Sequence, residues 1–590
     1  MQKIQTDSFF QRIWRRIQEG FTSLVKSPAF YVYLIAVVIY LPWFFPNLSD
    51  IAPWDETYYI VSGRNMLEGQ LPDLAYGPLL SFFYLLTSLP FLKNPFWLIH
   101  ANSLGRFLLF SSLFLGAWQV AKVFKERYRP VVLFGFVFVA PFLTQNFEYP
   151  ADLLFAALSA TAFSQAVLFL RTKKLKHVWW ASFWLGLGML TRGDALIIIL
   201  ALSVFFLWFG FKDHRWWRLV LAALVPFLAL SAGYVLLRGA LTGDFGTGMS
   251  FRSYTAFEQG QEVAMPAGEA RFGAPTESYY VARELFGTPE ENEYSVFRAI
   301  LRNPQAYITR LKAVLRTLPG LFLTAYQRRY ANVLALFALR GFIALIQEKK
   351  LPLALLHLIW TLPLSAGIAR TLVRVGYFRL FYFVLFSLAV IGLKALLESL
   401  NKTREGLVWA AAFGLMLALA FIFNQDGIQM SATVFLCWLL LAYLLSRRSA
   451  QNHGWQYMAM LLLLASAYLL RTGEIIFTQR TIGVEPQEEA ALKLREVTET
   501  GDTILTCTPS VVFLADREVA NFCGADIPEF ESSEAFIEWM RAQNFDAIFL
   551  DRAAPAVLVE LAFDQRGQAL TQIYAAEGGE AFILLLRTSN

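Results

Sequence analysis

Long apolar runs separated by short polar turns fill most of the chain. We expect these runs to form membrane-spanning helices, since a helix of about 20 apolar residues crosses the hydrocarbon core. Lys and Arg cluster in alternate turns, and cytoplasmic loops carry the excess of these residues. This alternation predicts about 13 crossings, near 30–45, 99–121, 131–144, 151–170, 178–190, 195–211, 217–237, 331–346, 353–368, 380–397, one span on each side of 424–429, and 455–470.

Basic residues before the first span set the predicted topology. They are Lys3, Arg12, Arg15, Arg16 and Lys26. We therefore expect a cytoplasmic N-terminus, and an odd number of crossings then places the C-terminal region outside. The apolar run 78–92 is short, and a crossing there would put the basic cluster at 122–129 outside. We expect an interfacial or re-entrant helix on the outer side instead.

Two outer regions differ from the rest. Residues 238–330 are long, polar and rich in Gly, Pro and aromatic residues, as in a lid or binding loop. With the outer loop at 47–98, this segment belongs to a predicted membrane domain of residues 1–473. From about 474, strand-like runs at 503–507, 547–550 and 581–586 alternate with helix-like runs at 532–541 and 556–563. They predict an extracytoplasmic α/β domain at 474–590.

Composition agrees with a mainly α-helical polytopic membrane protein. Apolar residues make up 56% and charged residues 16%, against roughly 25% charged in a soluble domain. This excludes a disordered chain and a disulfide-rich secreted scaffold. The net charge of +6 does not indicate nucleic-acid binding, because basic cytoplasmic loops supply it. Cys507 and Cys523 could pair in an oxidising compartment or remain reduced core thiols. We expect the protein in the cytoplasmic (inner) membrane, among membrane lipids.

Acidic residues lie in outer turns at the ends of predicted spans. Asp55 and Glu56 follow the first span, with Tyr58 beside them, and Glu148 and Asp152 lie between the third and fourth spans. Carboxylates at a bilayer edge are partly desolvated, which raises their basicity. Asp55 and Asp152 could instead cap the helices that follow them. Asp55, Glu56 and Asp152 could also hold a divalent cation.

Arginines lie on the same predicted side. Three of them occupy one outer turn, against the positive-inside tendency: Arg370, Arg374 and Arg379. Because guanidinium binds phosphate through paired hydrogen bonds, this turn favours an anionic ligand, although it could simply face lipid head groups. In another turn, Arg192 and Asp194 stand together, and a local ion pair accounts for them.

The order of these motifs resembles the polytopic C-type glycosyltransferases, in particular the protein O-mannosyltransferase and lipid A aminoarabinose transferase group. The resemblance is best over residues 30–210 and weaker to 400. It is carried by Asp55-Glu56 with the following Tyr, Gly63-Arg-Asn-Met-Leu-Glu-Gly, Gly77-Pro-Leu-Leu, Ala151-Asp-Leu-Leu, Leu190-Thr-Arg-Gly and Arg379-Leu-Phe-Tyr.

This resemblance implies a multi-span fold, an active site on the outer face and a polyprenyl-phosphate sugar donor. It implies that Asp55 is the catalytic base, with Glu56 beside it and Asp152 as a second acidic group. Many relatives have Lys-Pro-Pro-Leu where this chain has Tyr76-Gly-Pro-Leu. The phosphate-binding lysine is therefore missing, and its charge would have to come from Arg379, Arg374 or Arg64.

The expected activity is inverting transfer of a hexosyl or pentosyl group from polyprenyl phosphate to an acceptor hydroxyl on a protein, lipid or glycan. Asp55 would accept the proton of that hydroxyl, and no resident metal is required. The expected substrate-binding residues are Arg379, Arg374, Arg370, Arg64, Tyr58, Glu148 and Arg192. One alternative is a flippase or transporter for a lipid-linked glycan, which would favour ionisable groups near mid-membrane and inverted repeats. Another is a polysaccharide polymerase.

Overall fold

The computed structural model describes residues 28–52, 55–124, 149–211, 216–265, 274–325, 327–399, 485–521 and 530–586 except 577, 578 and 580, with isolated residues at 129, 133 and 147. The predicted spans at 131–144 and beyond residue 400 lie outside these residues, as do Glu148 and Cys523.

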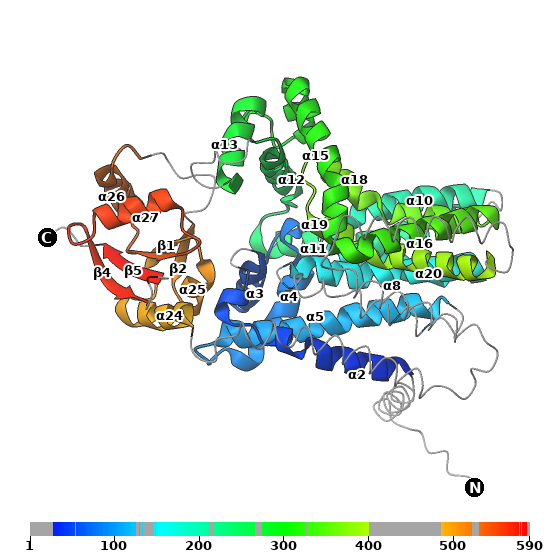
Figure 1. Cartoon of the computed structure of the whole chain (residues 1–590), viewed down its shortest axis with the longest axis horizontal. Helices are drawn as coiled ribbons and strands as arrows, with labels where there is room; N and C mark the ends of the chain where they lie inside the picture. Colours follow the sequence, from blue (N-terminus) through cyan, green and yellow to red (C-terminus); the bar gives the residue numbers. More distant parts are fainter. Residues whose placement is uncertain are drawn as a thin grey trace, which may run out of the picture.

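A bundle of apolar helices forms the largest part of the molecule (Figure 1). Its helices are α2 (Pro28–Tyr40), α5 (Trp97–Lys122), α8 (Pro150–Thr172), α9 (Leu175–Met189), α10 (Ala195–Gly210), α11 (Trp216–Thr242), α16 (Gln327–Gln347), α17 (Leu351–Ile359), α18 (Leu362–Ala369) and α20 (Tyr382–Ser399). α8 packs between α5 and α9, α11 packs on α9 and α10, and α16 packs on α20.

Within the described residues, the predicted spans coincide with these helices. The span expected at 151–170 is α8, and the span expected at 195–211 is α10. Within the described residues, four helical segments are long and apolar enough to cross a membrane: Trp97–Lys122, Pro150–Thr172, Trp216–Thr242 and Leu351–Ala369. The composition is therefore that of a multi-pass membrane protein, but the predicted total of 13 crossings is not confirmed. The last segment is interrupted between α17 and α18, where Pro363 in the first turn of α18 cannot donate a backbone hydrogen bond.

Short helices join α2 to α5 at one end of the bundle, which we call the α3 end (Figure 1). They are η1 (Leu41–Phe44), η2 (Leu48–Asp50), α3 (Asp55–Asn65), η3 (Met66–Glu68), η4 (Leu74–Tyr76), α4 (Pro78–Ser88) and η5 (Leu89–Phe91). α4 has 11 residues, too few to cross a membrane. A Cβ on Gly63 would lie 2.6 Å from the backbone nitrogen of Leu85, so a glycine is needed where α3 lies against α4.

The segment predicted as a long outer loop is largely helical. It contains α12 (Met249–Gln259), η8 (Gly260–Ala264), α13 (Ala274–Phe286), α14 (Val296–Arg302) and α15 (Pro304–Ala325). Its small core is made of Tyr254, Phe257, Phe286 and Ala299. α15 stands across the direction of the bundle helices (Figure 1), and it packs against α18 and α19 (Val375–Arg379). We call this segment the α12–α15 lobe.

The C-terminal region is an α/β domain, as the sequence predicts. Its helices are α24 (Pro486–Val497), α25 (Pro509–Leu514), α26 (Ser533–Ala542) and α27 (Ala556–Asp564), and its strands are β1 (Thr503–Thr506), β2 (Glu518–Asn521), β3 (Ala547–Asp551), β4 (Leu570–Ala575) and β5 (Ala581–Leu586). The strand order is β2-β1-β3-β5-β4. β1 is parallel to β2 and β3, whereas β5 is antiparallel to β3 and β4. Cys507 is disulfide-bonded, and both other cysteines lie outside the described residues.

The C-terminal domain packs on the α3 end of the bundle. The Glu485 carboxylate accepts hydrogen bonds from the side chains of Asn47 (3.0 Å) and Ser49 (2.8 Å). Buried residues of α24 and α25 belong to the same hydrophobic core as the bundle. The docking therefore combines apolar burial with polar contacts, and it places the domain over α3.

Candidate functional site

Glu56 belongs to a buried ion pair at the start of α3. Its carboxylate accepts hydrogen bonds from Nε of Arg106 (2.9 Å), from Nη2 of Arg106 (3.0 Å) and from the backbone amide of Ala52 (3.0 Å). Arg106, in α5, also donates to the carbonyl oxygens of Asp50 (2.8 Å) and Trp43 (3.4 Å). Both side chains are buried. The pair therefore fixes the start of α3 against α5 and leaves little of either group for a ligand.

Asp55 lies next to Glu56 in a different environment. It is the first residue of α3 and is half-buried. In the described part of the chain its carboxylate makes no ion pair and no hydrogen bond, so the alternative of a helix cap finds no support. The amide of Thr57 bonds instead to the carbonyl oxygen of Ala52 (3.2 Å). Asp55 thus offers an unengaged carboxylate.

Asp152 takes part in a charged network that joins three segments. It pairs with Arg192 in the turn between α9 and α10, and Nη2 of Arg192 lies 2.7 Å from Oδ2 of Asp194. The predicted local pair is therefore present and extends to α8. Nη2 of Arg370 lies 3.8 Å from Oδ1 of Asp194 and donates to the hydroxyl of Tyr377 (2.9 Å). Burial disfavours the charged form of Arg192, but the two carboxylates outweigh it and raise its pKa well above the ordinary value.

Tyr59, in α3, is subject to the charges of both Asp55 and this network. Tyr59 is buried, and burial raises its pKa to about 12. The charged groups that act on this phenol are Arg252, Asp55, Arg192 and Asp152. Because electrostatic interactions weaken with distance, these four groups lie near enough to the Tyr59 phenol to affect its pKa. Asp55 and the Asp152 network therefore act on the same buried side chain.

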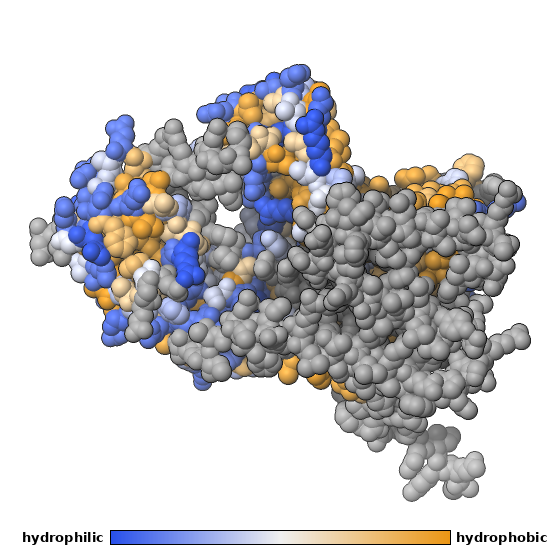
Figure 2. Space-filling view, in the orientation of Figure 1, coloured by the Kyte–Doolittle hydropathy of each residue, from blue (hydrophilic) through white to orange (hydrophobic). Residues whose placement is uncertain are grey.

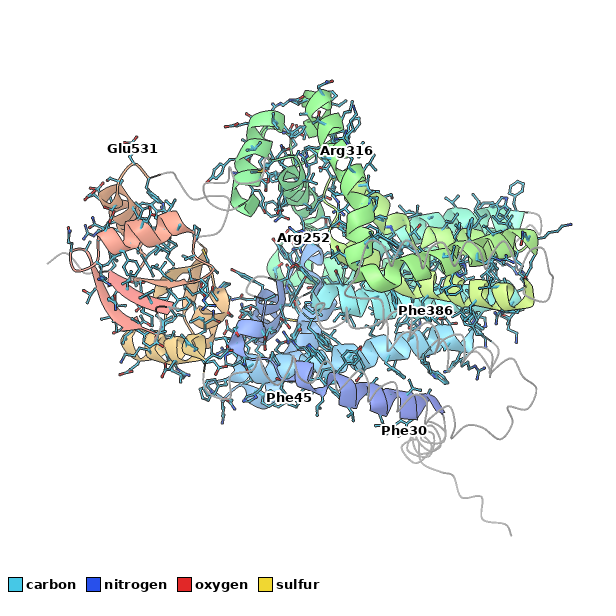
Figure 3. All side chains as sticks on the ribbon, viewed as in Figure 1. Phe30, Phe45, Arg252, Arg316, Phe386 and Glu531 are labelled. Carbon is cyan, nitrogen blue, oxygen red and sulfur yellow. The ribbon has the colours of Figure 1, made fainter. Side chains whose placement is uncertain are left out.

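Arg252 approaches this end from the α12–α15 lobe. Figure 3 labels it close to the α3 end of the bundle. Its guanidinium carbon lies 5.1 Å from the ring centroid of Tyr76. Among the residues that the structure describes, its side chain has no ion-pair or hydrogen-bond partner. Arg252 is also exposed, so its guanidinium donors are available to a ligand.

The turn beneath Arg252 is fixed by a glycine. Gly77 has a φ of +66°, and a Cβ there would lie 2.8 Å from the carbonyl oxygen of Thr191. Only glycine meets both demands without strain. The amide of Leu79 also donates to the carbonyl oxygen of Leu190 (2.8 Å). The Tyr76-Gly77 turn therefore packs the loop between α3 and α4 against the turn that holds Arg192.

Comparison with solved structures identifies the architecture. No family model and no curated protein matches the sequence. ArnT from Cupriavidus metallidurans, bound to undecaprenyl phosphate, is 15% identical over 95% of this chain and 98% of its own, with a TM-score of 0.54. The fold is that of the C-type glycosyltransferases. The oligosaccharyltransferase AglB from Archaeoglobus fulgidus, in complex with an inhibitory peptide and a dolichol-phosphate, is 14% identical over 92% of this chain and 70% of its own, with a TM-score of 0.47.

On this C-type glycosyltransferase fold, the remaining predicted residues fall into two groups. Arg374 is exposed near the charged network, where it donates to Oε1 of Gln259 (3.3 Å). Tyr58 and Arg64 instead face the C-terminal domain: the Tyr58 ring meets Phe513 edge-on at 5.6 Å, and Arg64 pairs with Asp516 at 3.0 Å. Two predicted side chains lie outside the described part of the structure: Glu148 and Arg379.

Two arginines of the site were not predicted. Arg106 lies within the apolar run expected at 99–121, where a charge is costly and usually paired, so its position was a usable signal. Arg252 is one of several basic residues in the 238–330 segment. Nothing in the sequence distinguishes it, because only the tertiary structure brings α12 to Tyr76.

The carboxylates do not form a cation site in the described residues. No three His, Cys, Asp or Glu side chains gather there in a way that could hold a metal ion. Glu56 is engaged by Arg106 and Asp152 by Arg192. The alternative in which Asp55, Glu56 and Asp152 together bind a divalent cation therefore finds no support in this geometry.

Proposed function

We propose that the protein is a membrane glycosyltransferase that moves a sugar from a polyprenyl-phosphate donor to an acceptor hydroxyl by inverting transfer, at the outer face of the cytoplasmic membrane. The observation that carries this proposal is that the adjacent carboxylates of Asp55 and Glu56 are engaged differently. Glu56 is engaged by Arg106, whereas Asp55 and Arg252 have no hydrogen-bond or ion-pair partner among the described residues. Both Asp55 and Arg252 act electrostatically on the buried phenol of Tyr59, so an available base and an available guanidinium lie near the same side chain.

Asp55 acts as the general base in this proposal. It accepts the proton of the acceptor hydroxyl while that oxygen forms a bond to the anomeric carbon. The bond between the anomeric carbon and the phosphate oxygen breaks, and the polyprenyl phosphate leaves with the bonding electrons as an anion. Proton transfer can come late, as positive charge develops on the sugar, so a carboxylate is a strong enough base.

Arg252 and Arg374 bind the donor phosphate in this proposal. Guanidinium groups suit phosphate because they donate two parallel hydrogen bonds and stay charged. Arg252 makes no competing ion pair in the part of the chain that the structure describes, and Arg374 is exposed with one long contact to Gln259 (3.3 Å). Arg252 would supply the charge that relatives take from lysine, since it lies over Tyr76 at that position.

Asp152, Arg192 and Arg370 position the site. Arg192 donates to the carboxylates of Asp152 and Asp194, and Arg370 donates to the hydroxyl of Tyr377. Such a network has few donors left for substrate, but it holds α8, the α9–α10 turn and α19 at one end of the bundle. We expect this network to hold Tyr59 and Asp55 in position rather than to take part in the reaction.

Support also comes from the fold. A solved structure with this architecture, ArnT, is bound to undecaprenyl phosphate. The proposed orientation, with a cytoplasmic N-terminus and the C-terminal domain outside, would place the α3 end where a lipid-linked donor presents its sugar. The sugar can be hexosyl or pentosyl, and the acceptor can be protein, lipid or glycan.

Reconstituted protein tests the activity. Liposomes containing full-length protein would be given undecaprenyl phosphate bearing a radiolabelled sugar, one sugar at a time, with a panel of peptide, lipid and glycan acceptors. Transfer predicts free undecaprenyl phosphate and label on one acceptor in equal amounts. Intact donor appearing in the opposite leaflet without release would instead identify a flippase. A ladder of growing glycan would identify a polymerase.

A further inference from the structure

The α12–α15 lobe exposes a stripe of large apolar side chains. On α15, Ile308 and Leu315 are 46% and 48% exposed, and their spacing of seven residues puts them on one helix face. On α14, Phe297 and Leu301 are 69% and 60% exposed and lie one turn apart. Figure 2 shows apolar and polar side chains interleaved on this lobe. Such a series is unusual on a surface that meets only water.

Two cations lie on and beside this stripe, because Lys312 falls between Ile308 and Leu315 and Arg316 follows one turn later. Lys312 and Arg316 lie one turn apart on α15 and are exposed, and neither has an acidic partner within the described ranges. By contrast, Arg298 and Arg302 on α14 pair with Glu293 and Glu291. Both free cations line a pocket of about 530 Å³, whose other walls include Met265, Thr309 and Ala313. The pocket thus combines positive charge with apolar walls.

In a bilayer that surrounds the bundle, the stripe would lie at the level of the lipid head groups. α15 crosses the direction of the bundle helices and packs against α18 and α19 at the α3 end (Figure 1). α10 and α11 present exposed apolar side chains such as Val204, Trp208 and Val225, as helices in contact with lipid do. A bilayer around these helices would meet α15 at its head groups. Arg316, labelled in Figure 3, lies on this part of the lobe.

We propose that the exposed face of α14 and α15 rests on the bilayer surface and that Lys312 and Arg316 bind the phosphate of an anionic phospholipid in the adjoining pocket. The apolar side chains enter the boundary between head groups and acyl chains, as in interfacial amphipathic helices. The unpaired cations complement the negative head group. This surface is separate from Asp55 and Arg252, so it does not depend on the proposed transfer reaction.

Photo-crosslinking in lipid nanodiscs tests this docking. Full-length protein would carry p-benzoylphenylalanine in place of Leu315, in nanodiscs that contain equal amounts of phosphatidylglycerol and phosphatidylcholine. The matched control carries the same residue in place of Leu492, an exposed apolar position (40%) on the C-terminal domain. We expect lipid adducts at position 315 and none at position 492. Equal yields at the two positions would overturn the proposal.

Charge selectivity is measured in the same nanodiscs. Since each cation near an anionic surface contributes roughly a fivefold preference, we expect phosphatidylglycerol adducts to exceed phosphatidylcholine adducts by about tenfold or more at position 315. The variants Lys312→Gln and Arg316→Gln should each lower this preference roughly fivefold. A preference that both variants leave unchanged would overturn the role of the cations. Loss of the preference in sodium phosphate, but not in sodium chloride of equal ionic strength, would identify a site for free phosphate and also overturn the proposal.

Discussion

Two charged regions at the α3 end of the bundle use similar residues in different ways. The Glu56–Arg106 pair is buried and closed, since Arg106 donates to Glu56 and to two backbone carbonyls. The region around Asp55 and Arg252 has its charges partly solvated and, in the described part of the chain, unpaired. Both regions contain a carboxylate and a guanidinium, and the carboxylates are adjacent in sequence. The role of each charged residue therefore does not follow from its type. It follows from how buried the side chain is and from whether its hydrogen bonds are satisfied.

This difference separates stability from chemistry. A buried ion pair that loses one partner leaves an uncompensated charge in a medium of low dielectric constant, which is strongly destabilising. A free carboxylate or guanidinium contributes little to folding, but it can meet a substrate without first breaking an internal bond. We therefore expect substitutions in the closed pair to act on folding and substitutions in the open region to act on turnover.

The largest expected effect is that of Asp55→Asn. Because general-base catalysis contributes roughly 10²- to 10⁴-fold, we expect kcat to fall by that factor while the melting temperature stays the same. The measurement is sugar transfer in liposomes beside thermal unfolding of the same preparation. Asp73→Asn is the matched control: Asp73 accepts a hydrogen bond from the amide of Ala75 (2.7 Å), which asparagine can also accept. Full turnover by Asp55→Asn would remove this residue from the role of base.

Glu56→Gln should reverse this pattern. Removing one partner of a buried pair costs about 3–5 kcal/mol, so we expect the free energy of unfolding to fall by that amount, measured by denaturant titration in detergent. Asp244→Asn is the control, since Asp244 is an exposed partner of Arg238, and such pairs contribute about 1 kcal/mol or less. If Glu56→Gln were as stable as the wild type but inactive, Glu56 rather than Asp55 would be the reacting group.

Much of the fold follows from the sequence, because membrane crossing and strand burial leave strong local patterns. α8 and α10 end within a few residues of the apolar runs that predict them. In the C-terminal domain, β3 and β5 are continuous apolar runs and were predicted. β2 begins with Glu518 and has four residues, and β4 contains polar positions. Short or polar strands depend on their neighbours in the sheet, so the sequence alone did not predict them.

The sequence predicts less of the candidate site than of the fold. The sequence placed carboxylates and arginines on one side of the bundle, and in the structure Asp55, Asp152 and Arg192 all act electrostatically on Tyr59. The residue pattern alone does not tell Asp55 from Glu56, because the partner that engages Glu56 lies 50 residues away in α5. Only the family resemblance assigned Asp55 as the base. The sequence also named Arg64 among the candidates to bind the donor phosphate, and it could not predict that Arg64 pairs with Asp516. Such pairings depend on tertiary structure and leave no local signal.

Arg252→Ala tests the role of the guanidinium in the region around Asp55 and Arg252. Since a hydrogen bond to a charged group contributes about 1.5–3 kcal/mol, we expect KM for the lipid donor to rise roughly 10- to 100-fold with a smaller change in kcat. Arg566→Ala is the matched control, because Arg566 also lies over an aromatic ring, that of Phe563 at 5.2 Å, but in the C-terminal domain. An unchanged donor KM in Arg252→Ala would show that another cation holds the phosphate.

The smallest expected effect concerns the pair that joins the two domains. Asp516 is half-exposed and has a φ of +63°, a conformation that asparagine also adopts readily. Asp516→Asn therefore removes the charge that meets Arg64 without straining the backbone. We expect a loss of less than about 1 kcal/mol in the free energy of unfolding, which should disappear at high salt.

Glu496→Gln provides the control for that measurement, since it breaks an exposed pair with Lys493 inside α24 and leaves the domain contact intact. A loss in Asp516→Asn as large as that in Glu56→Gln would mean that the Arg64–Asp516 pair, rather than the shared apolar core, holds the C-terminal domain on α3. In that case a partly exposed ion pair at the domain interface would contribute as much to the free energy of unfolding as the buried Glu56–Arg106 pair.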